Sequence, residues 1–321
     1  MQRDSKIYVA GHKGLVGSAI VRRLRAAGFL NIVSRSHDEL ELTDSGAVRE
    51  FFEMDRPEYV FMAAAKVGGI LANDTYPADF ILDNLAIQNN VIHESWRAGV
   101  KRLLFLGSSC IYPRDCPQPI REEYLLTGPL ESTNRAYAIA KIAGIEMCRA
   151  YNRQHGTRFL SAMPTNLYGP GDNYDLKSSH VLPALIRKIH EAGERGDAEV
   201  PVWGTGRPRR EFLYSEDMAD ACVMLMRLDE VIFDRQCTQE PPVINIGCGS
   251  DLTIKELAEL VADTLGIETS FRFDTSKPDG TPRKLLDVSR LFSLGWRPQT
   301  PLEEGIKAAY ADFLQRNPVA A

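Results

Sequence analysis

Near its start the chain reads Ile7-Tyr8-Val9-Ala10-Gly11-His12-Lys13-Gly14-Leu15-Val16-Gly17, a short apolar run followed by a glycine-rich loop. A helical pattern then runs from Val16 to Ala27, and Gly28 closes it as a C-terminal cap would. Glycines between a strand and a helix let the backbone approach a pyrophosphate, which the free N–H groups of the helix N-terminus bind. The loop therefore predicts dinucleotide binding, although its G-x-x-G-x-x-G spacing departs from the dehydrogenase form G-x-G-x-x-G.

Strand-like and helical segments alternate along the chain. Expected strands cover residues 7–10, 32–33, 59–64, 103–106, 158–163 and 243–246, and expected helices cover residues 16–27, 47–54, 80–98, 136–155 and 215–228. This alternation favours an α/β fold, a Rossmann-type doubly wound parallel sheet with a smaller α/β substrate-binding lobe. The texture changes after Pro170, so we expect residues 1–168 plus 211–248 to form the dinucleotide-binding domain and residues 169–210 plus 249–321 the substrate lobe.

Charge and composition argue against several classes of function. The formal net charge is −5, so no global attraction favours nucleic acid or a membrane surface. No apolar run approaches the roughly 20 residues of a membrane span. The six cysteines form no C-x-x-C pair, and cysteines and histidines show no metal-ligand spacing. We therefore expect a cytoplasmic, reduced enzyme without a metal.

The residues after the second expected strand bear on the choice of cofactor. NAD-binding proteins usually place Asp or Glu there to bind the ribose 2′-hydroxyl group, whereas this chain has Ser34-Arg35-Ser36-His37. A guanidinium group can bind a 2′-phosphate through paired hydrogen bonds, and Lys13 could add a second charge. The pattern favours NADP(H) over NAD, and the alternative is that Arg35 and Lys13 are solvated surface charges.

Tyr137 and Lys141, in the sequence Tyr137-Ala138-Ile139-Ala140-Lys141, indicate a reaction type. Four residues apart, they lie on one face of the expected helix. A nearby ammonium group stabilises a phenolate and lowers the pKa of the phenol from its usual value of about 10. Tyr137 could then exchange a proton with a carbonyl or alcohol group while Lys141 lowers the pKa of Tyr137.

Further acid–base candidates follow the fourth expected strand and Pro170. Gly107-Ser108-Ser109-Cys110 lies where open parallel sheets bind their ligands. If this segment is extended, the Ser108 and Cys110 side chains point the same way. Cys110 is a base if the site stabilises its thiolate, or else a buried inert thiol. His180, with an ordinary pKa near neutrality, is an acid–base candidate or else a cap or surface residue.

Basic residues in the expected second lobe are candidates for phosphate contacts, because Arg and Lys are the usual partners of a diphosphate. They are Arg187, Arg207, Arg209 and Arg210 near the expected cleft, and Lys277, Arg283 and Lys284 in what we expect to be a flexible loop. For at least half of them the alternative is a solvated surface charge.

The glycine loop, the Ser-Ser-Cys segment and the Tyr-x-x-x-Lys pair together resemble the extended short-chain dehydrogenase/reductases that act on nucleotide sugars. Longer stretches narrow the resemblance to the branch that epimerises and reduces GDP-4-keto-6-deoxy-D-mannose, and they are residues 11–20, 63–70 with 73–80, 106–113, and 277–284 with Leu286 and Asp287. The resemblance covers nearly the whole chain. It implies epimerisation of the sugar at C3 and C5, followed by NADPH-dependent reduction of its 4-keto group.

The resemblance also implies roles for individual residues. Cys110 would be the base and His180 the acid of the epimerisation, Tyr137 would give the proton in the reduction while Ser108 supports the substrate oxygen, and Lys141 would also hold the nicotinamide ribose. Cofactor contacts are expected from Gly11, His12, Lys13, Gly14, Leu15, Val16, Gly17, Arg35, His37, Leu106, Gly107, Ser108, Ser109, Lys141, Pro164, Thr165, Asn166, Leu167 and His180, and substrate contacts from Arg187, Trp203, Arg210 and Asp279. His37 stands where relatives often carry a second Arg. The usual partner in the family is a second copy, which implies a homodimer built on residues 80–98 and 136–155.

Other functions are compatible with the same fold. A nucleotide-sugar 4-epimerase would not need Cys110 and His180, and a 4,6-dehydratase usually has an acidic pair after its active-site hydroxyl residue, which Ser109-Cys110-Ile111 lacks. A non-catalytic NADP-sensing protein is a further alternative, because a fold does not guarantee a function. Such proteins tend to lose the Tyr or the Lys, and both are present here.

Overall fold

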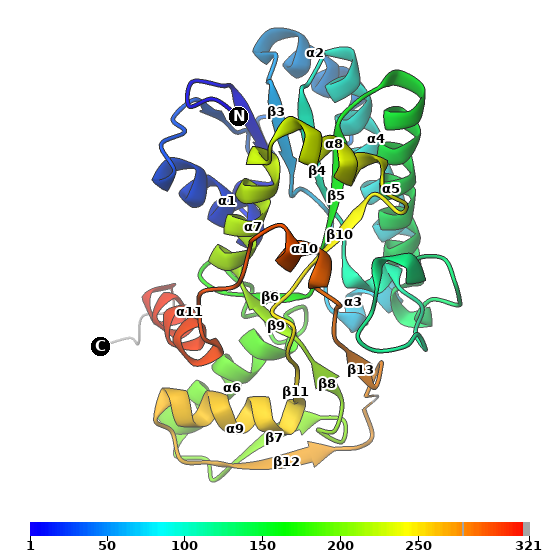
Figure 1. Ribbon diagram of the computed structural model, residues 1–321. Helices are drawn as coiled ribbons and strands as arrows, with labels where there is room; N and C mark the ends of the chain where they lie inside the picture. The colour runs from blue at the N-terminus through cyan, green and yellow to red at the C-terminus, as the bar shows by residue number, and fades with distance from the viewer. Residues whose placement is uncertain (278, 317–321) are drawn as a thin grey trace.

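A six-stranded parallel sheet forms the larger lobe in the computed structural model, which describes residues 1–277 and 279–316 (Figure 1). The strand order is β10-β5-β4-β3-β1-β2, and every neighbouring pair is parallel. The strands are β1 (Ile7–Ala10), β2 (Ile32–Val33), β3 (Tyr59–Met62), β4 (Arg102–Leu106), β5 (Phe159–Pro164) and β10 (Val243–Ile246). All but β2 are buried along their whole length, as nearly continuous apolar runs predict. The expected doubly wound α/β sheet is confirmed.

Helices cover both faces of this sheet. Ile7 and Val9 of β1 point into the core beneath α1 (Leu15–Ala26) and α7 (Ser215–Arg227), while Tyr8 points into the opposite core, as the alternation of strand side chains requires. That opposite core lies beneath α2 (Ser45–Asp55), α4 (Pro77–Arg97) and α5 (Arg135–His155), with α4 and α5 packed side by side. Shorter elements complete this lobe, namely α3 (Ile70–Thr75), α8 (Glu230–Thr238) and α10 (Ser289–Ser293).

The smaller lobe, in the lower part of Figure 1, has a core of its own. Its helices are α6 (Val181–Arg195), α9 (Ile254–Leu265) and α11 (Leu302–Arg316), and α6 and α9 pack on the parallel pair β7 (Glu199–Trp203) and β12 (Ser270–Asp274). Two small sheets lie between the lobes: β6 (Asn166–Tyr168) with β9 (Phe212–Tyr214), and β11 (Leu252–Thr253) with β8 (Arg209–Arg210) and β13 (Arg283–Lys284). These short strands bring segments from both ends of the second half of the chain to the carboxyl edge of the large sheet.

Several element ends differ from the expected ones for local reasons. The strand expected over residues 59–64 ends at Met62, because its partner β1 ends at Ala10 and Ala63 N makes the last hydrogen bond between them, to Ala10 O at 3.0 Å. The helix expected from Ala47 begins at Ser45, because the Asp44 carboxylate accepts from Gly46 N and Ala47 N. Arg283 and Lys284, expected in a flexible loop, form a strand that pairs with β8.

The division of the chain into two domains stays a prediction. Leu286 and Val288, assigned to the substrate lobe, pack into the core beneath the large sheet, and α10 contacts β10. The last five residues of the expected substrate lobe, 317–321, lie outside the described residues. In the described part of the chain no helix is long and apolar enough to cross a membrane.

Candidate active site

The glycine loop fits a dinucleotide. Gly11 has a left-handed φ of 81°, and a Cβ there would lie 2.7 Å from Ala64 N, so only glycine suits the position. A Cβ on Gly17 would lie 2.1 Å from Gly11 O, which lets the first turn of α1 pack directly on the loop. Gly14 caps α1 without a side chain. The N–H groups at this helix end are therefore open to a pyrophosphate.

The residues expected to read the ribose lie at the end of β2. The Arg35 guanidinium forms an ion pair with Asp55 at 2.8 Å and lies over the Phe51 ring, while His37 is exposed and pairs with Glu41 at 3.0 Å. Lys13 is exposed in the glycine loop. The Asp55 carboxylate thus holds Arg35 at the rim of the expected adenosine site. A bound 2′-phosphate would compete with this carboxylate for the guanidinium group.

Ser108, Cys110, Tyr137 and Lys141 meet at the carboxyl end of β4. The Ser108 hydroxyl lies within hydrogen-bonding reach of both the Cys110 thiol and the Tyr137 phenol. Lys141 Nζ donates to Leu106 O at 2.8 Å and lies 5.7 Å from the centre of the Tyr137 ring. Four residues that sequence reasoning assigned to one site are therefore in contact or close to it.

The backbone that brings Cys110 to this cluster is a turn. Ser108 is extended, but the segment does not stay extended as far as Cys110, because residues Ser109–Ile111 form one turn of 3₁₀ helix after β4. Ile111 N donates to Ser108 O at 3.2 Å and closes the turn. The turn still leaves the Ser108 hydroxyl beside the Cys110 thiol.

The expected lowering of the Tyr137 pKa is wrong for the protein without ligands. Burial raises the pKa of Tyr137, and Cys110 raises it further, while the hydrogen bond from Ser108 opposes them. Lys141, which donates to the carbonyl of Leu106, is not among the groups that shift the pKa of Tyr137. Burial lowers the pKa of Lys141 to about 8. The pair thus becomes an effective acid–base unit only when a ligand changes the site.

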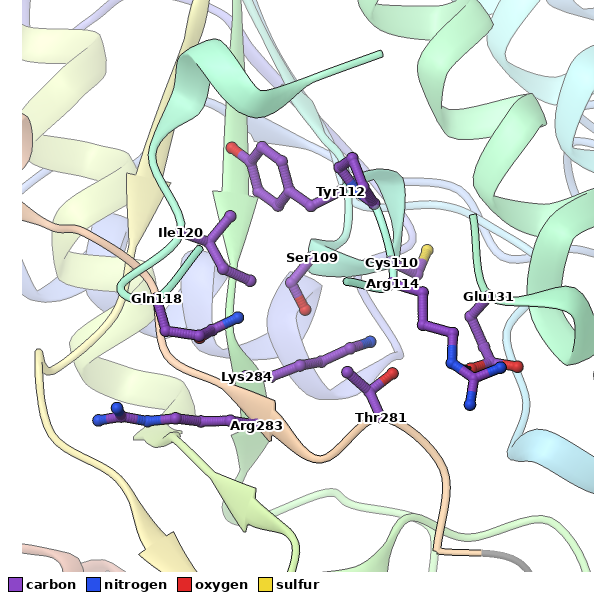
Figure 2. A pocket seen from close by; sticks show the side chains of 11 residues that line it. Ser109, Cys110, Tyr112, Arg114, Gln118, Ile120, Glu131, Thr281, Arg283 and Lys284 are labelled. Carbon is purple, nitrogen blue, oxygen red and sulfur yellow. Dashed lines mark ion pairs between the residues drawn. The ribbon is translucent and has the colours of Figure 1, made fainter. Parts of the chain in front are cut away.

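Cys110 lies on the wall of a small cavity of about 10 Å³, room for roughly one water molecule. Figure 2 shows Lys284 reaching from β13 between Ser109 and Thr281 toward the Cys110 turn. Burial raises the pKa of the Cys110 thiol, and Lys284, the Ser108 hydrogen bond and Lys141 oppose that rise. Sequence reasoning placed Lys284 in a loop and treated it as a phosphate contact. The sequence signal that could have pointed to Lys284 is its position in residues 277–284, one of the stretches that carry the family resemblance.

His180 stands at the first position before α6, and its side chain makes no capping hydrogen bond. Burial by the surrounding protein lowers the pKa of His180, and Lys284 lowers it further. In the resting protein His180 is therefore the neutral partner and Cys110 the protonated one. A base role for Cys110 requires a proton to leave the thiol first.

The expected substrate residues do not all reach this centre. Arg210 lies near Lys284, and burial lowers its pKa while Asp279 opposes that shift. Asp279 accepts hydrogen bonds from Thr205 N and Thr205 Oγ1, and Trp203 is exposed with Lys277 over its ring at 5.7 Å. Arg187 is paired with Glu191 at 2.7 Å on α6. Arg209 and Arg283 are both paired with Asp251, so these two serve the small sheet.

The segment expected to line the nicotinamide is fixed by a buried glutamate that sequence reasoning missed. Thr165 Oγ1 and Asn166 Nδ2 both donate to the carbonyl oxygen of Glu211, at 3.2 and 2.9 Å. The Glu211 carboxylate accepts from Gly249 N and Leu286 N at 2.7 and 3.0 Å. Pro164 ends β5 and Leu167 lies in β6. Glu211 thus ties the nicotinamide wall to the strand that carries Lys284.

These features define a class of protein. A glycine loop built for a dinucleotide, next to a Ser, Tyr and Lys cluster at the carboxyl edge of a parallel sheet, is the arrangement of a nucleotide-dependent oxidoreductase or epimerase. Residues 7–247 match the NAD dependent epimerase/dehydratase family, and the chain belongs to that family. Among the described residues no group of three His, Cys, Asp or Glu side chains could hold a metal ion.

Within this family the chain is similar to proteins named GDP-L-fucose synthase. It is 57% identical to GDP-L-fucose synthase 1 of Arabidopsis thaliana over 98% of this chain and 94% of the relative. It is 52% identical to GDP-L-fucose synthase of Escherichia coli strain K12 over 97% of each chain. A solved GDP-mannoheptose C4 reductase from Campylobacter jejuni with NADP bound superposes with a TM-score of 0.88, at 42% identity, covering 98% of this chain and 99% of that chain.

Proposed function

We propose that the protein converts GDP-4-keto-6-deoxy-D-mannose to GDP-L-fucose, by epimerisation at C3 and C5 and NADPH-dependent reduction at C4. The observation that carries the proposal is the placement of Ser108 against both Cys110 and Tyr137. One hydroxyl then serves a proton-transfer residue for carbon and a proton donor for oxygen in the same site. The identity of 52–57% to proteins named GDP-L-fucose synthase supports the same substrate.

In the epimerisation, Cys110 is the base and His180 the acid. The 4-keto group acidifies the hydrogens at C3 and C5, so the Cys110 thiolate removes one of them and the C–H electron pair moves onto the keto oxygen. Ser108 lies where it can hydrogen-bond that oxygen as it gains charge. This step needs Cys110 to have lost its proton and His180 to have gained one beforehand, and His180 then returns a proton to carbon on the other face. Cys110 becomes a thiol and His180 becomes neutral, and both must exchange protons before the second epimerisation.

In the reduction, Tyr137 gives its phenolic proton to the C4 oxygen. Bound NADPH supplies the hydride to C4. The Gly11–Gly17 loop and the N-terminus of α1 suit the pyrophosphate, and Pro164 to Leu167 form the wall expected beside the nicotinamide. Lys141, which donates to Leu106 O, would also donate to a hydroxyl of the nicotinamide ribose.

The remaining expectations about assembly and location are part of this proposal. The family resemblance supports a homodimer in which α4 and α5 pack against the same helices of a second copy. Leu82 and Ile139 on these helices are 67% and 38% exposed, apolar side chains of the kind that an interface covers. The substrate and cofactor are soluble metabolites, which supports a cytoplasmic location.

A solvent-isotope experiment tests the proposal. The protein is mixed with NADPH and GDP-4-keto-6-deoxy-D-mannose in deuterium oxide, and NADPH absorbance and deuterium at C3 and C5 are followed together. We expect NADPH to be consumed and both carbons to carry deuterium. Reduction without deuterium would make the protein a C4 reductase, and no consumption at all would refute the proposal.

Replacing Cys110 separates the two halves of the reaction. We expect Cys110→Ser to slow deuterium incorporation by roughly 10²- to 10⁴-fold, the usual contribution of general acid–base catalysis, with NADPH affinity unchanged. Cys148→Ser is the matched control, because Cys148 is also buried but points from α5 into the core beneath the large sheet. Unchanged exchange in Cys110→Ser would remove the base assignment.

A further inference from the structure

The proposed role of Cys110 as a base requires a nearby group that stabilises its thiolate, and Lys284 lines the same cavity as Cys110. Burial favours the neutral thiol of Cys110, while a base must be a thiolate. Some positive charge must therefore stabilise the thiolate inside the site. Lys284 and Lys141 are the two lysines that act on Cys110, and Lys284 acts more strongly. Burial lowers the pKa of Lys284 itself, Cys110 opposes that shift and Arg210 adds to it, so the thiolate and the ammonium stabilise each other.

Lys284 is free for this task. Among the described residues no carboxylate forms an ion pair with the Lys284 ammonium. The Leu106 carbonyl, which accepts from Lys141, does not accept from Lys284. Glu131, which lines the same cavity, is paired with Arg114 at 3.5 Å. Of the anions that Lys284 could meet there, the Cys110 thiolate has the largest effect on it.

The fold fixes the position of this ammonium. Arg283 and Lys284 form β13, which pairs with Arg209 and Arg210 of β8. The next residue but one, Leu286, is anchored by its N–H to the Glu211 carboxylate at 3.0 Å. Strand alternation sends the Lys284 side chain toward Cys110, while Arg283 pairs with Asp251 on the other side.

We propose that Lys284 is a positioning residue that stabilises the Cys110 thiolate and so makes Cys110 competent as the base. This inference rests on the proposed epimerisation. When Cys110 removes a proton from carbon, an S–H bond forms, and the ammonium loses its anionic partner while the keto oxygen gains the charge. In the described part of the chain, the other charged and titratable groups near Lys284 or Cys110 are Lys141 of α5, Arg210 of β8, His180 before α6, Tyr137, Tyr112, Cys116, the paired Glu131 and Arg114, and Arg283.

The test is a pH titration of the Cys110 thiolate without substrate. The ultraviolet absorbance of the thiolate is measured in each protein as the difference from its Cys110→Ser counterpart, which removes the signals of the other cysteines and of tyrosines. We expect Lys284→Met to raise the midpoint by about one pH unit, a roughly tenfold loss of thiolate at fixed pH. Lys284→Arg is expected to restore most of the loss, and Lys284→Gln replaces Lys284→Met if that variant does not fold.

Arg283→Met is the matched control, because it removes the neighbouring cation whose charge is used by Asp251. Its thiolate midpoint should equal that of the unmodified protein. Equal midpoints in Lys284→Met and the unmodified protein would overturn the inference, and a raised KM with an unchanged midpoint would make Lys284 a substrate contact instead. Because no substrate is present in the titration, failure of the proposed function appears separately, in the deuterium experiment.

Discussion

At the scale of residues, the site shows why a motif does not fix the state of its side chains. Tyr137 and Lys141 are close to each other, but the Lys141 ammonium donates to Leu106 O and the Tyr137 pKa is raised by burial. A cofactor ribose and a keto oxygen would bring the polar partners that the protein alone does not supply. Without ligands the Tyr137 phenol is thus protonated but a weak acid, and it becomes a better proton donor only when cofactor and substrate are bound.

Replacing the phenol tests its role as proton donor. We expect Tyr137→Phe to lower the rate of NADPH oxidation with the keto sugar by roughly 10²- to 10⁴-fold, because hydride transfer then leaves an unprotonated C4 oxygen. Deuterium exchange at C3 and C5 should persist, since Cys110 and His180 are intact. Tyr76→Phe, an exposed tyrosine outside the cluster, is the control. Turnover of Tyr137→Phe equal to that of the control would refute the donor role.

The sequence predicts Ser108, Cys110, Tyr137 and Lys141 as one site because each follows a strand or lies on a helix whose place in the sheet is set by apolar periodicity. Lys284 and Glu211 could not be assigned the same way. Their positions depend on β13 and β8, two-residue strands without apolar alternation that form through contacts between distant segments. The sequence does not predict the protonation states of these side chains either, because burial affects the pKa of Tyr137 more than its spacing from Lys141 does.

At the scale of elements, the loop between β6 and α6 holds a buried carboxyl group, that of Asp172, and the backbone of the same residue contacts α11. Asp172 Oδ1 accepts from Asn173 N at 2.7 Å, whereas Oδ2 has no partner. Arg316 of α11 donates to the backbone oxygen of Asp172 at 2.8 Å. Burial raises the pKa of Asp172 to about 7. The loop that leads to His180 thus holds a carboxyl group that is unfavourable in its charged form.

The buried Asp172 carboxyl group predicts a pH dependence of the free energy of unfolding. Because the folded pKa of Asp172 lies above its unfolded value, its contribution to stability is complete below about pH 4 and is lost as pH rises through 7. We expect Asp172→Asn to be more stable than the unmodified protein by on the order of 2 kcal/mol at pH 8, with a smaller gain at pH 5. Urea unfolding at both values measures this, with exposed Asp263→Asn as the control. A gain that is the same at pH 5 and 8 would contradict the assignment.

At the scale of the whole molecule, the large sheet carries one half of the site and the small sheets carry the other. The sequence predicts the sheet because its strands are apolar runs buried on both sides. It does not predict how β8, β11 and β13 meet, because their pairing is long-range. The expected homodimer interface is the outer face of α4 and α5, an extended surface to which many side chains contribute.

The homodimer can be tested at this face. We expect the protein to sediment as a dimer, and Leu82→Arg to shift it toward the monomer, because a buried unpaired guanidinium is costly at an apolar interface. Leu30→Arg is the control, since Leu30 is 81% exposed and lies outside α4 and α5. A monomer in the unmodified protein, or a dimer unaffected by Leu82→Arg, would exclude this interface.

The pairing of β13 with β8 gives the order of translation a consequence for activity. The ribosome releases the strands of the large sheet, together with Cys110 and Tyr137, well before it releases Lys284. N-terminal portions of a chain generally fold first during synthesis, so a nascent chain can complete its parallel sheet while the cavity at Cys110 still lacks one wall. A chain that ends before Lys284 would lack this wall and also Leu286 and Val288 of the core beneath the sheet, so the site is complete only when the last part of the chain has been made.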